Sequence, residues 1–86
     1  MQWWVYVLRC GDGSFYTGIA TNVGRRLKTH QDGRGARYTR GRGPLELWWQ
    51  DGPMTHQEAL RAERRVKRFS HQRKSALGGE HAEVRL

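Results

Sequence analysis

Two phenols, Tyr6 and Tyr16, flank a Gly-rich turn and share the same numbering parity. In an antiparallel hairpin, that arrangement brings both side chains to one face of the sheet. Buried Tyr residues of a small sheet usually fill the core and tie their hydroxyl to a backbone group. The functional interpretation is that one phenol lies next to a phosphate group. There the phenol would hydrogen-bond to the water that attacks the phosphate, or would take a proton from that water. Both interpretations stay open on these two residues alone.

Arg26 and His30 form a second pair, four residues apart on a segment with helical spacing. Both side chains therefore project from one border of the expected helix. A guanidinium there can stabilise the charge that builds on a pentacovalent phosphorus, and an imidazole can relay a proton near neutral pH. The alternative is an ordinary basic face of a helix.

Glu63 is the only acid within the segment 61–74, where seven basic residues accompany it. A surface ion pair with Arg64 or Lys67 is one interpretation of this carboxylate. Glu63 nevertheless lies at the edge of the apolar stripe of the expected helix, a position that suits an oxygen ligand of Mg²⁺. Glu58 is the weaker candidate because a Thr-x-x-Glu capping box already uses it.

The segment 33–43 holds four Gly, four Arg and no acid, which predicts a mobile basic loop. The planar guanidinium groups of Arg bind phosphates, a Tyr ring can stack on a base, and Gly lets the protein backbone approach the nucleic acid closely. A flexible loop in solvent is the alternative. With basic residues of the segment 61–74, the loop supplies the candidate nucleic-acid-binding residues, which are Arg34, Arg37, Tyr38, Arg40, Arg42, Arg64, Lys67 and Arg68.

The charge balance favours a polyanion as the partner. Sixteen Lys and Arg against eight Asp and Glu give a net charge of +8 and a pI near 10.8, and thirteen of the sixteen are Arg. Arg presents a planar fork of donors that matches phosphate oxygens. A basic surface without any partner is the alternative.

The single cysteine, Cys10, can form neither an internal disulfide nor a zinc site, which fits a reducing compartment. No stretch approaches the roughly 18 apolar residues of a membrane span, and the first residues do not resemble a signal peptide. We therefore expect a cytoplasmic protein that has no membrane partner and is able to associate with the nucleoid. The oligomeric state is left open.

A pattern of strands and helices must position these residues. Aromatic and β-branched runs predict strands, and apolar residues at helical spacing behind capping signals predict helices. The expected elements are strands 3–9, 15–19 and 45–50, a helix from Thr21 or Asn22 to 32–33, a helix from Thr55 through Phe69, and a short helix from Ser70 to Leu77 that Gly78-Gly79 stops. The fold class is α+β, with a central three-stranded antiparallel sheet flanked by helices in the order β-β-α-β-α-α.

The first strand is apolar at almost every position, which predicts a sheet covered on both faces. Adjacent Trp48 and Trp49 in the third strand are expected to send one indole to each face. We expect one domain over residues 1–79 and a flexible C-terminal tail over residues 80–86.

Together these residues resemble the GIY-YIG nuclease superfamily, especially its small stand-alone bacterial members that consist of a single domain. The two triplets that give the family its name correspond to Val5-Tyr6-Val7 and Tyr16-Thr17-Gly18, and the two tyrosines are ten residues apart. Arg26 and His30 stand where the family carries its catalytic Arg and a frequent His. The resemblance covers nearly the whole chain.

Downstream residues extend the resemblance. Gly35-Ala36-Arg37-Tyr38-Thr39 is similar to a loop of the stand-alone group, and Glu63, after Glu58-Ala59-Leu60, matches the metal-binding Glu. Ser75 lies where repair-type relatives place an additional Asn of the metal site. The resemblance implies that Tyr6 and Tyr16 belong to the active site.

By the same resemblance, Arg26 stabilises the transition state, His30 assists or positions, and Glu63 holds one Mg²⁺ or Mn²⁺ ion. The implied activity is hydrolysis of phosphodiester bonds in DNA, branched or single-stranded, in repair or recombination, while RNA stays open as a substrate. One alternative is a non-catalytic nucleic-acid-binding module with the same fold. Another is an accessory subunit that contacts a repair protein through an exposed aromatic face around Trp3 or Trp49.

Overall fold

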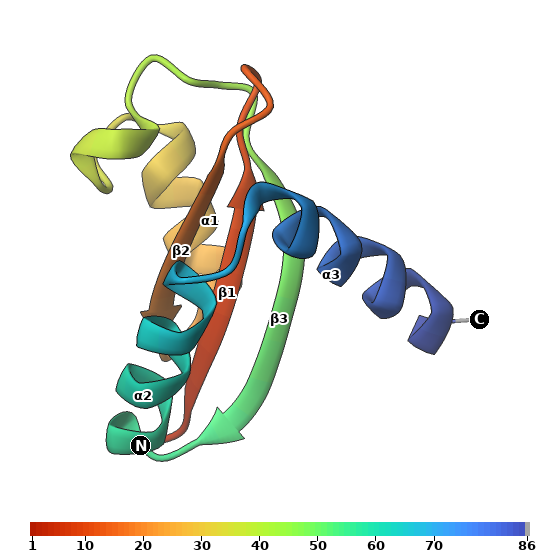
Figure 1. The fold of residues 1–86 in the computed structure, drawn as a ribbon. Helices are drawn as coiled ribbons and strands as arrows, with labels where there is room; N and C mark the ends of the chain where they lie inside the picture. The colour runs from red at the N-terminus through yellow and green to blue at the C-terminus, as the bar shows by residue number, and fades with distance from the viewer. Residues whose placement is uncertain (86) are drawn as a thin grey trace.

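The computed structural model describes residues 1–85, with side chains placed for residues 1–78. Strands β1 (Trp3–Arg9), β2 (Phe15–Ala20) and β3 (Glu46–Met54) form one antiparallel sheet in the order β2-β1-β3. The helices are α1 (Val23–Gln31), α2 (His56–Lys67) and α3 (His71–Arg85), and a short 3-10 turn, η1 (Arg37–Thr39), lies in the loop before β3 (Figure 1). The predicted α+β fold and its order β-β-α-β-α-α are confirmed.

The central strand β1 is buried on both faces because its side chains alternate between two apolar clusters. Tyr6 packs with Val23 of α1 on one face of the sheet. Val7 packs with Val66 of α2 and Leu77 of α3 on the other face. Figure 1 shows the same layers, with α1 behind the sheet and α2 in front of it. The apolar run of the first strand therefore predicted the layering correctly.

Two helices begin at the predicted caps. The Asn22 side chain accepts a hydrogen bond from the Arg25 backbone N–H at 3.0 Å at the start of α1. At the start of α2, the Thr55 hydroxyl accepts from the Glu58 N–H at 3.1 Å, and the Glu58 carboxylate accepts from the Thr55 N–H at 2.9 Å. Such caps satisfy backbone N–H groups that the first turn leaves unpaired. They fix where both helices start, and so which side chains each helix presents to the sheet.

The prediction that Trp48 and Trp49 point to opposite faces was wrong. The pairing of β1 with β3 shifts from Val7 opposite Trp49 to Leu8 opposite Leu47, so Trp48 is an extra residue in β3. A β-bulge of this kind bends its strand and re-aims a side chain. Both indoles consequently pack against the apolar cluster on the face that α2 and α3 cover.

Helix α3 does not stop at Gly78-Gly79, as predicted, but continues to Arg85. The reason is a contact with β3, because a Cβ on Gly78 would overlap the indole of Trp48. Gly78 therefore allows a close approach between helix and sheet instead of ending the helix. Of the expected tail 80–86, residue 86 lies outside the described residues, and the flexibility of the tail stays a prediction.

Gly78→Ala is expected to lower the free energy of unfolding by about 1–3 kcal/mol, as is usual when a group is forced into filled space. The added methyl group would displace Trp48, whose Nε1–H donates to the Lys74 carbonyl oxygen at 3.1 Å. Urea denaturation followed by Trp fluorescence measures the loss. The control is Gly24→Ala at an exposed position of α1, where the nearest atom to the new Cβ is 3.7 Å away. Equal stability of the two variants would contradict the close contact.

No helix among residues 1–85 is long and apolar enough to cross a membrane. The exposed aromatic face that the accessory-subunit hypothesis requires is also absent among the side chains of residues 1–78. Trp3 lies against His56, with ring centroids 4.3 Å apart, and Trp49 packs under α2 and α3. The exposed large hydrophobic side chains of this part are Met1 and Tyr38.

Candidate active site

Four elements bring the predicted catalytic side chains to the β2 edge of the sheet. Tyr6 of β1 and Tyr16 of β2 are diagonal neighbours on one face, with ring centroids 6.4 Å apart. The His30 ring of α1 lies 5.1 Å from that of Tyr16. Arg26 of α1 and Glu63 of α2 lie close enough to shift the pKa of both phenols. The structure thus gathers all five residues around one place.

His30 holds the hydroxyl of Tyr6. The His30 side chain is buried, and its Nε2 lies 2.9 Å from the Tyr6 hydroxyl oxygen. Its Nδ1 accepts a hydrogen bond from the Ala36 backbone N–H at 3.2 Å, and this contact favours the neutral tautomer that carries the ring proton on Nε2. His30 therefore donates to Tyr6, and the hydroxyl proton of Tyr6 is left for another acceptor.

Two glycines make room for this hydrogen bond. A Cβ on Gly18, the last residue of the Tyr-Thr-Gly triplet, would lie 2.6 Å from the Tyr6 hydroxyl oxygen and 3.1 Å from the Tyr16 ring. A Cβ on Gly35 would overlap the imidazole of His30. Both glycines are thus explained by the approach of the backbone to catalytic candidates, without any need for unusual backbone angles.

Burial governs the protonation of the two phenols. Burial, followed by the neighbouring Tyr16, raises the pKa of Tyr6 to about 12, although Arg26 acts in the opposite direction. Burial also raises the pKa of Tyr16, again against the effect of Arg26. The Arg26 guanidinium lowers the pKa of both phenols, but burial outweighs this effect. With these groups alone, both phenols carry their protons at neutral pH.

Glu63 is the carboxylate that faces the phenols. Its negative charge raises the pKa of both Tyr6 and Tyr16, and its side chain is 20% exposed. Lys67, one turn later, places its Nζ 3.5 Å from the Glu63 Oε2. No group of three or more His, Cys, Asp or Glu side chains suited to a metal occurs among the described residues. Glu63 fits a Mg²⁺ ion that takes one carboxylate and completes its octahedron with water and phosphate oxygens.

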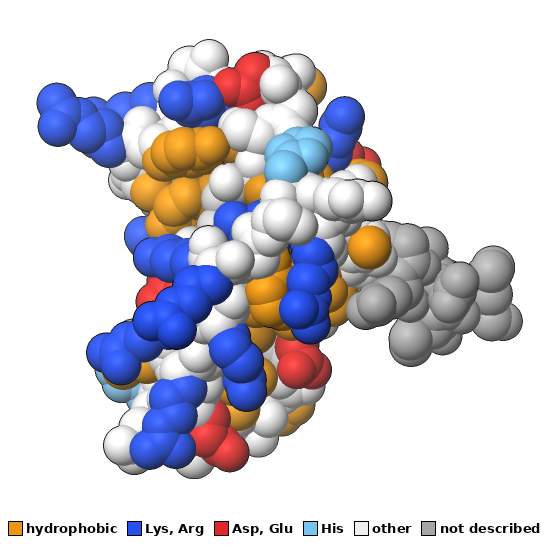
Figure 2. All heavy atoms as spheres, in the orientation of Figure 1, with side chains coloured by type: hydrophobic (Ala, Val, Ile, Leu, Met, Phe, Trp, Pro, Cys, Tyr) orange, Lys and Arg blue, Asp and Glu red, His pale blue; other side chains and the backbone are white. Residues whose placement is uncertain are grey.

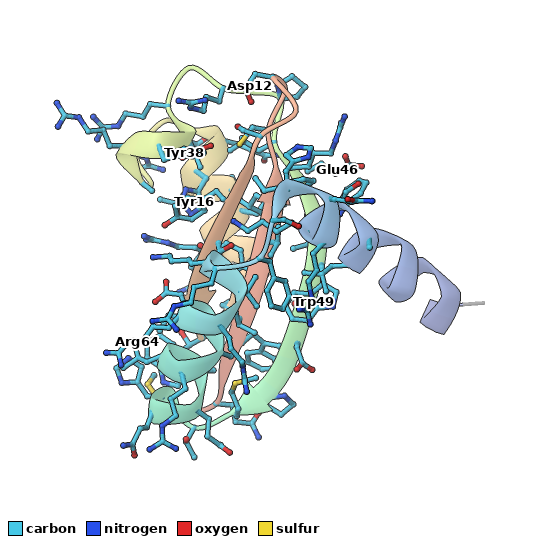
Figure 3. The ribbon with its side chains drawn as sticks, viewed as in Figure 1. Asp12, Tyr16, Tyr38, Glu46, Trp49 and Arg64 are labelled. Atoms are coloured by element: carbon cyan, nitrogen blue, oxygen red, sulfur yellow. The ribbon has the colours of Figure 1, made fainter. Side chains whose placement is uncertain are left out.

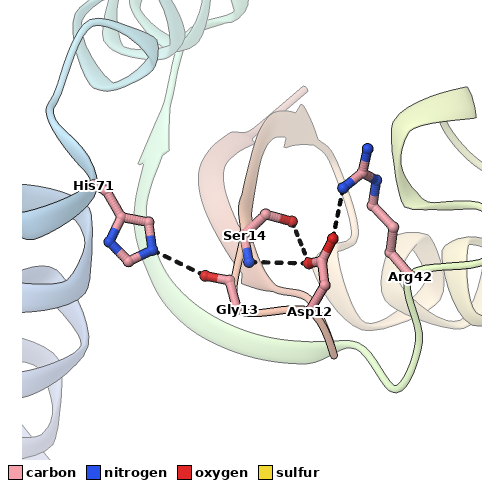
Figure 4. A network of polar contacts seen from close by, with 5 residues as sticks. All are labelled: Asp12, Gly13, Ser14, Arg42 and His71. Carbon is pink, nitrogen blue, oxygen red and sulfur yellow. Dashed lines mark hydrogen bonds and ion pairs between the residues drawn. The ribbon is translucent and has the colours of Figure 1, made fainter.

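A polar network ties the basic loop to the turn between β1 and β2 (Figure 4). The Asp12 carboxylate accepts from Ser14 and pairs with Arg42 at 2.6 Å, and these contacts hold the pKa of Asp12 at about 2. Arg42 in turn lies over the Tyr38 ring, 4.3 Å from its centroid. Tyr38 stacks toward Tyr16 with centroids 6.1 Å apart, and Figure 3 shows the two rings between η1 and β2.

The predicted nucleic-acid-binding residues divide into two groups. Arg42 and Tyr38 are engaged in the network just described, and Arg34 forms an exposed pair with Asp32 at 3.1 Å. The remaining candidates are exposed and, apart from the contact of Lys67 with Glu63, form no ion pair among residues 1–78; they are Arg37, Arg40, Arg64, Lys67 and Arg68. Figure 2 shows Lys and Arg side chains gathered along the face that α2 occupies.

Sequence reasoning did not assign several residues that build the site. Ala36 and Thr39 surround the His30 ring, since the Thr39 hydroxyl lies 3.0 Å from Nδ1 and donates to the Ala36 carbonyl oxygen at 2.8 Å. Gly18 and Gly35 provide the space. The signal was present in the segment Gly35-Ala36-Arg37-Tyr38-Thr39, which resembles a family loop. Of that segment, only Arg37 and Tyr38 were given a role, in nucleic-acid binding. Its other three residues, Gly35, Ala36 and Thr39, lie against the His30 imidazole.

The stability of the protein is expected to fall as the pH drops below about 6.5. Burial, and then Arg26, lowers the pKa of His30 from its ordinary value of 6.5. His30 therefore binds a proton more readily in the unfolded chain than in the folded one. Its contribution to the free energy of unfolding is fully present above pH 6.5 and is lost as the pH falls toward the pKa of the folded state. Urea denaturation between pH 5 and 8 measures this slope. His30→Gln should flatten it, whereas His56→Gln should keep it; an unchanged slope in His30→Gln would disprove the assignment.

Comparison with known proteins agrees with this geometry. The sequence profile of the GIY-YIG catalytic domain matches residues 2–75. The chain therefore belongs to the GIY-YIG family, whose nuclease domains support a nuclease-like function for it.

Within that family, the chain is similar to proteins of the UPF0213 group. It is 48% identical over 77 residues to the UPF0213 protein BH0048 of Halalkalibacterium halodurans, which covers 90% of this chain and 82% of the relative. It is 49% identical over 76 residues to a UPF0213 protein of Cupriavidus pinatubonensis, covering 88% of this chain and 84% of that protein.

Two solution NMR structures share the fold. That of the UPF0213 protein BH0048 from Bacillus halodurans matches with a TM-score of 0.55 at 48% identity, over 90% of this chain and 82% of that one. That of the protein EF2693 from E. faecalis matches with a TM-score of 0.60 at 37% identity, over 88% of this chain and 81% of that one.

Proposed function

We propose that the protein is a divalent-metal-dependent endonuclease that hydrolyses phosphodiester bonds in DNA, with a role in repair or recombination. The observation that carries the proposal is the meeting of two phenols, a guanidinium and a carboxylate at one edge of the sheet. These groups come from four different elements, which a purely structural role of each would not require.

The chemistry assigns a part to each side chain. Arg26 neutralises the non-bridging oxygens of the phosphate as charge builds on them. The Tyr6 hydroxyl accepts a hydrogen bond from His30, so its own proton points away from the imidazole. Tyr6 or Tyr16 then orients the water that attacks phosphorus in line with the leaving 3′ oxygen. Because both phenols are protonated at neutral pH, hydrogen bonding to that water is their ground-state role.

Glu63 would hold the divalent cation, and a bound Mg²⁺ supplies Lewis-acid stabilisation of the leaving oxygen. The support from this chain is the position of the carboxylate, which faces both phenols and has only a 3.5 Å contact with Lys67. A single carboxylate also agrees with the preference of Mg²⁺ for one or two protein ligands at sites that bind phosphate.

The basic face around α2 and the loop would bind the DNA backbone. Each phosphate contact made by a Lys or Arg releases counterions, so binding should weaken as the salt concentration rises. This property is shared by the alternative, a non-catalytic binding module with the same fold. Only a dependence of cleavage on metal separates the two functions.

Removal of metal is expected to abolish cleavage and leave binding in place. The test incubates the protein with labelled single-stranded, duplex and branched DNA in Mg²⁺, in Mn²⁺ and in chelator, and follows both cleavage and binding. Metal-dependent cutting supports the endonuclease. Salt-sensitive binding without cleavage in any metal would instead favour the binding module, and preference among the substrates reports which DNA structure is used.

A further inference from the structure

A hollow of about 270 Å³ borders the candidate active site at Tyr16. It is lined by residues of four elements, namely Phe15, Tyr16 and Thr17 of β2, Tyr38 of η1, Lys67 of α2 and Lys74 of α3. Lys67 is also the residue whose Nζ lies 3.5 Å from the Glu63 carboxylate. The hollow and the catalytic groups therefore share two residues at their border, Tyr16 and Lys67.

Two lysines meet in this hollow, although the chain has only three lysines and thirteen arginines. Burial, together with the charge of Lys67, lowers the pKa of Lys74. None of the ion pairs among residues 1–78 involves Lys74. The ammonium groups of Lys67 and Lys74 repel each other, and no acid neutralises Lys74. An anion bound between them would relieve this repulsion.

Thr17, one of the residues that line the hollow, has an unpaired hydroxyl. Thr17 is 3% exposed, and its Oγ1 is the buried side-chain polar atom that has no hydrogen-bond partner among the described residues. A buried hydroxyl without a partner destabilises a fold, and a Val of the same shape would avoid that cost. The hydroxyl is thus an independent sign that this place receives a ligand with an acceptor oxygen.

We propose that Lys67, Lys74 and Thr17 form a phosphate subsite, which holds a backbone phosphate of the nucleic-acid strand next to the phosphate that is cut. The inference rests on the proposed function and names how that site holds its substrate. The compact ammonium groups supply charge, and the Thr17 hydroxyl donates to a phosphate oxygen or to a water bound by it. A phosphate held there fixes the strand against Tyr16 and Glu63.

The test compares Lys74→Gln with Lys28→Gln, since Lys28 is the remaining lysine and lies exposed on α1. Lys67 is kept because its change would also disturb Glu63. NMR titration with inorganic phosphate should shift the side-chain signals of Lys74 and Thr17 in a saturable way, with affinity about tenfold weaker or worse in Lys74→Gln. Lys28→Gln should behave as the unmodified protein does.

Binding of a short single-stranded DNA in chelator gives a second readout. Lys74→Gln should lower the slope of log K against log salt by about 0.7, the value for one phosphate contact on a single strand. Equal phosphate affinity and equal slope in both lysine variants would overturn the subsite. If phosphate binds at Lys74 but the protein never cleaves DNA, the subsite proposal stands and the endonuclease proposal is rejected. The experiment therefore distinguishes failure of the subsite from failure of the proposed function.

Thr17→Val separates a ligand-binding hydroxyl from a structural one. If the subsite is correct, this variant should bind phosphate more weakly than the unmodified protein while its urea midpoint stays equal or rises. A lower midpoint together with unchanged phosphate binding would show that the hydroxyl serves the fold, and would contradict its part in the subsite.

Discussion

Glu63→Gln is expected to lower metal-dependent cleavage by at least about 100-fold, because a metal ion at a leaving oxygen contributes several kcal/mol to the transition state. The amide keeps the shape of the side chain and loses its charge, so the fold and DNA binding should persist. The measurement is single-turnover cleavage at saturating DNA, with binding recorded in chelator.

A second readout of Glu63→Gln does not depend on activity. The Glu63 carboxylate raises the pKa of Tyr6 and Tyr16, so its neutralisation should lower both values. Spectroscopic titration of tyrosinate detects this change. The matched control is Glu58→Gln on the same helix. Glu58 belongs to the capping box, so this variant should keep full cleavage. Full cleavage by Glu63→Gln would remove Glu63 from the mechanism.

Gly18→Ala should combine a large loss of cleavage with a modest loss of stability. The new Cβ would lie 2.6 Å from the Tyr6 hydroxyl oxygen, so the phenol must move and lose its hydrogen bond to His30. A displacement of about 1 Å at a catalytic group typically costs on the order of 100-fold in rate. The free energy of unfolding should fall by about 1–3 kcal/mol.

Gly24→Ala is the control for the glycine change, because its Cβ meets only ordinary contact with the Asn22 side chain at 3.7 Å. It should keep full cleavage and gain up to about 1 kcal/mol of stability as Ala replaces Gly in a helix. Cleavage rates and urea denaturation are compared for both variants. If Gly18→Ala cleaves as well as Gly24→Ala does, the position of the Tyr6 hydroxyl does not matter for the reaction.

The spacing of a few residues was enough to predict which side chains share a face, whereas the resemblance to the GIY-YIG family marked them as candidate site residues. Tyr6 and Tyr16 share parity across a short hairpin, and a strand period of two then leaves only one face for both. Arg26 and His30 are four apart on a helix whose cap at Asn22 could be read directly. Local rules of this kind hold because each depends on neighbours within a few residues along the chain.

Contacts between distant segments could not be predicted in the same way. Nothing local distinguishes Gly78 from a helix stop, because its meaning depends on Trp48 thirty residues earlier. The bulge at Trp48 likewise arises from the pairing of β3 with β1 and not from the sequence of β3 itself. Both errors came from applying a local rule where a tertiary contact decides.

The sequence by itself determined the elements, their order and the residue types that meet at the β2 edge, because strand and helix periods and capping groups act over short distances. Only the tertiary structure decided the protonation and orientation of those residues. The tautomer of His30 follows from the Ala36 N–H, and the raised pKa of Tyr6 follows mainly from burial between sheet and helix. Burial and hydrogen bonding are properties of the whole packed chain, so they exist only once the distant segments have met.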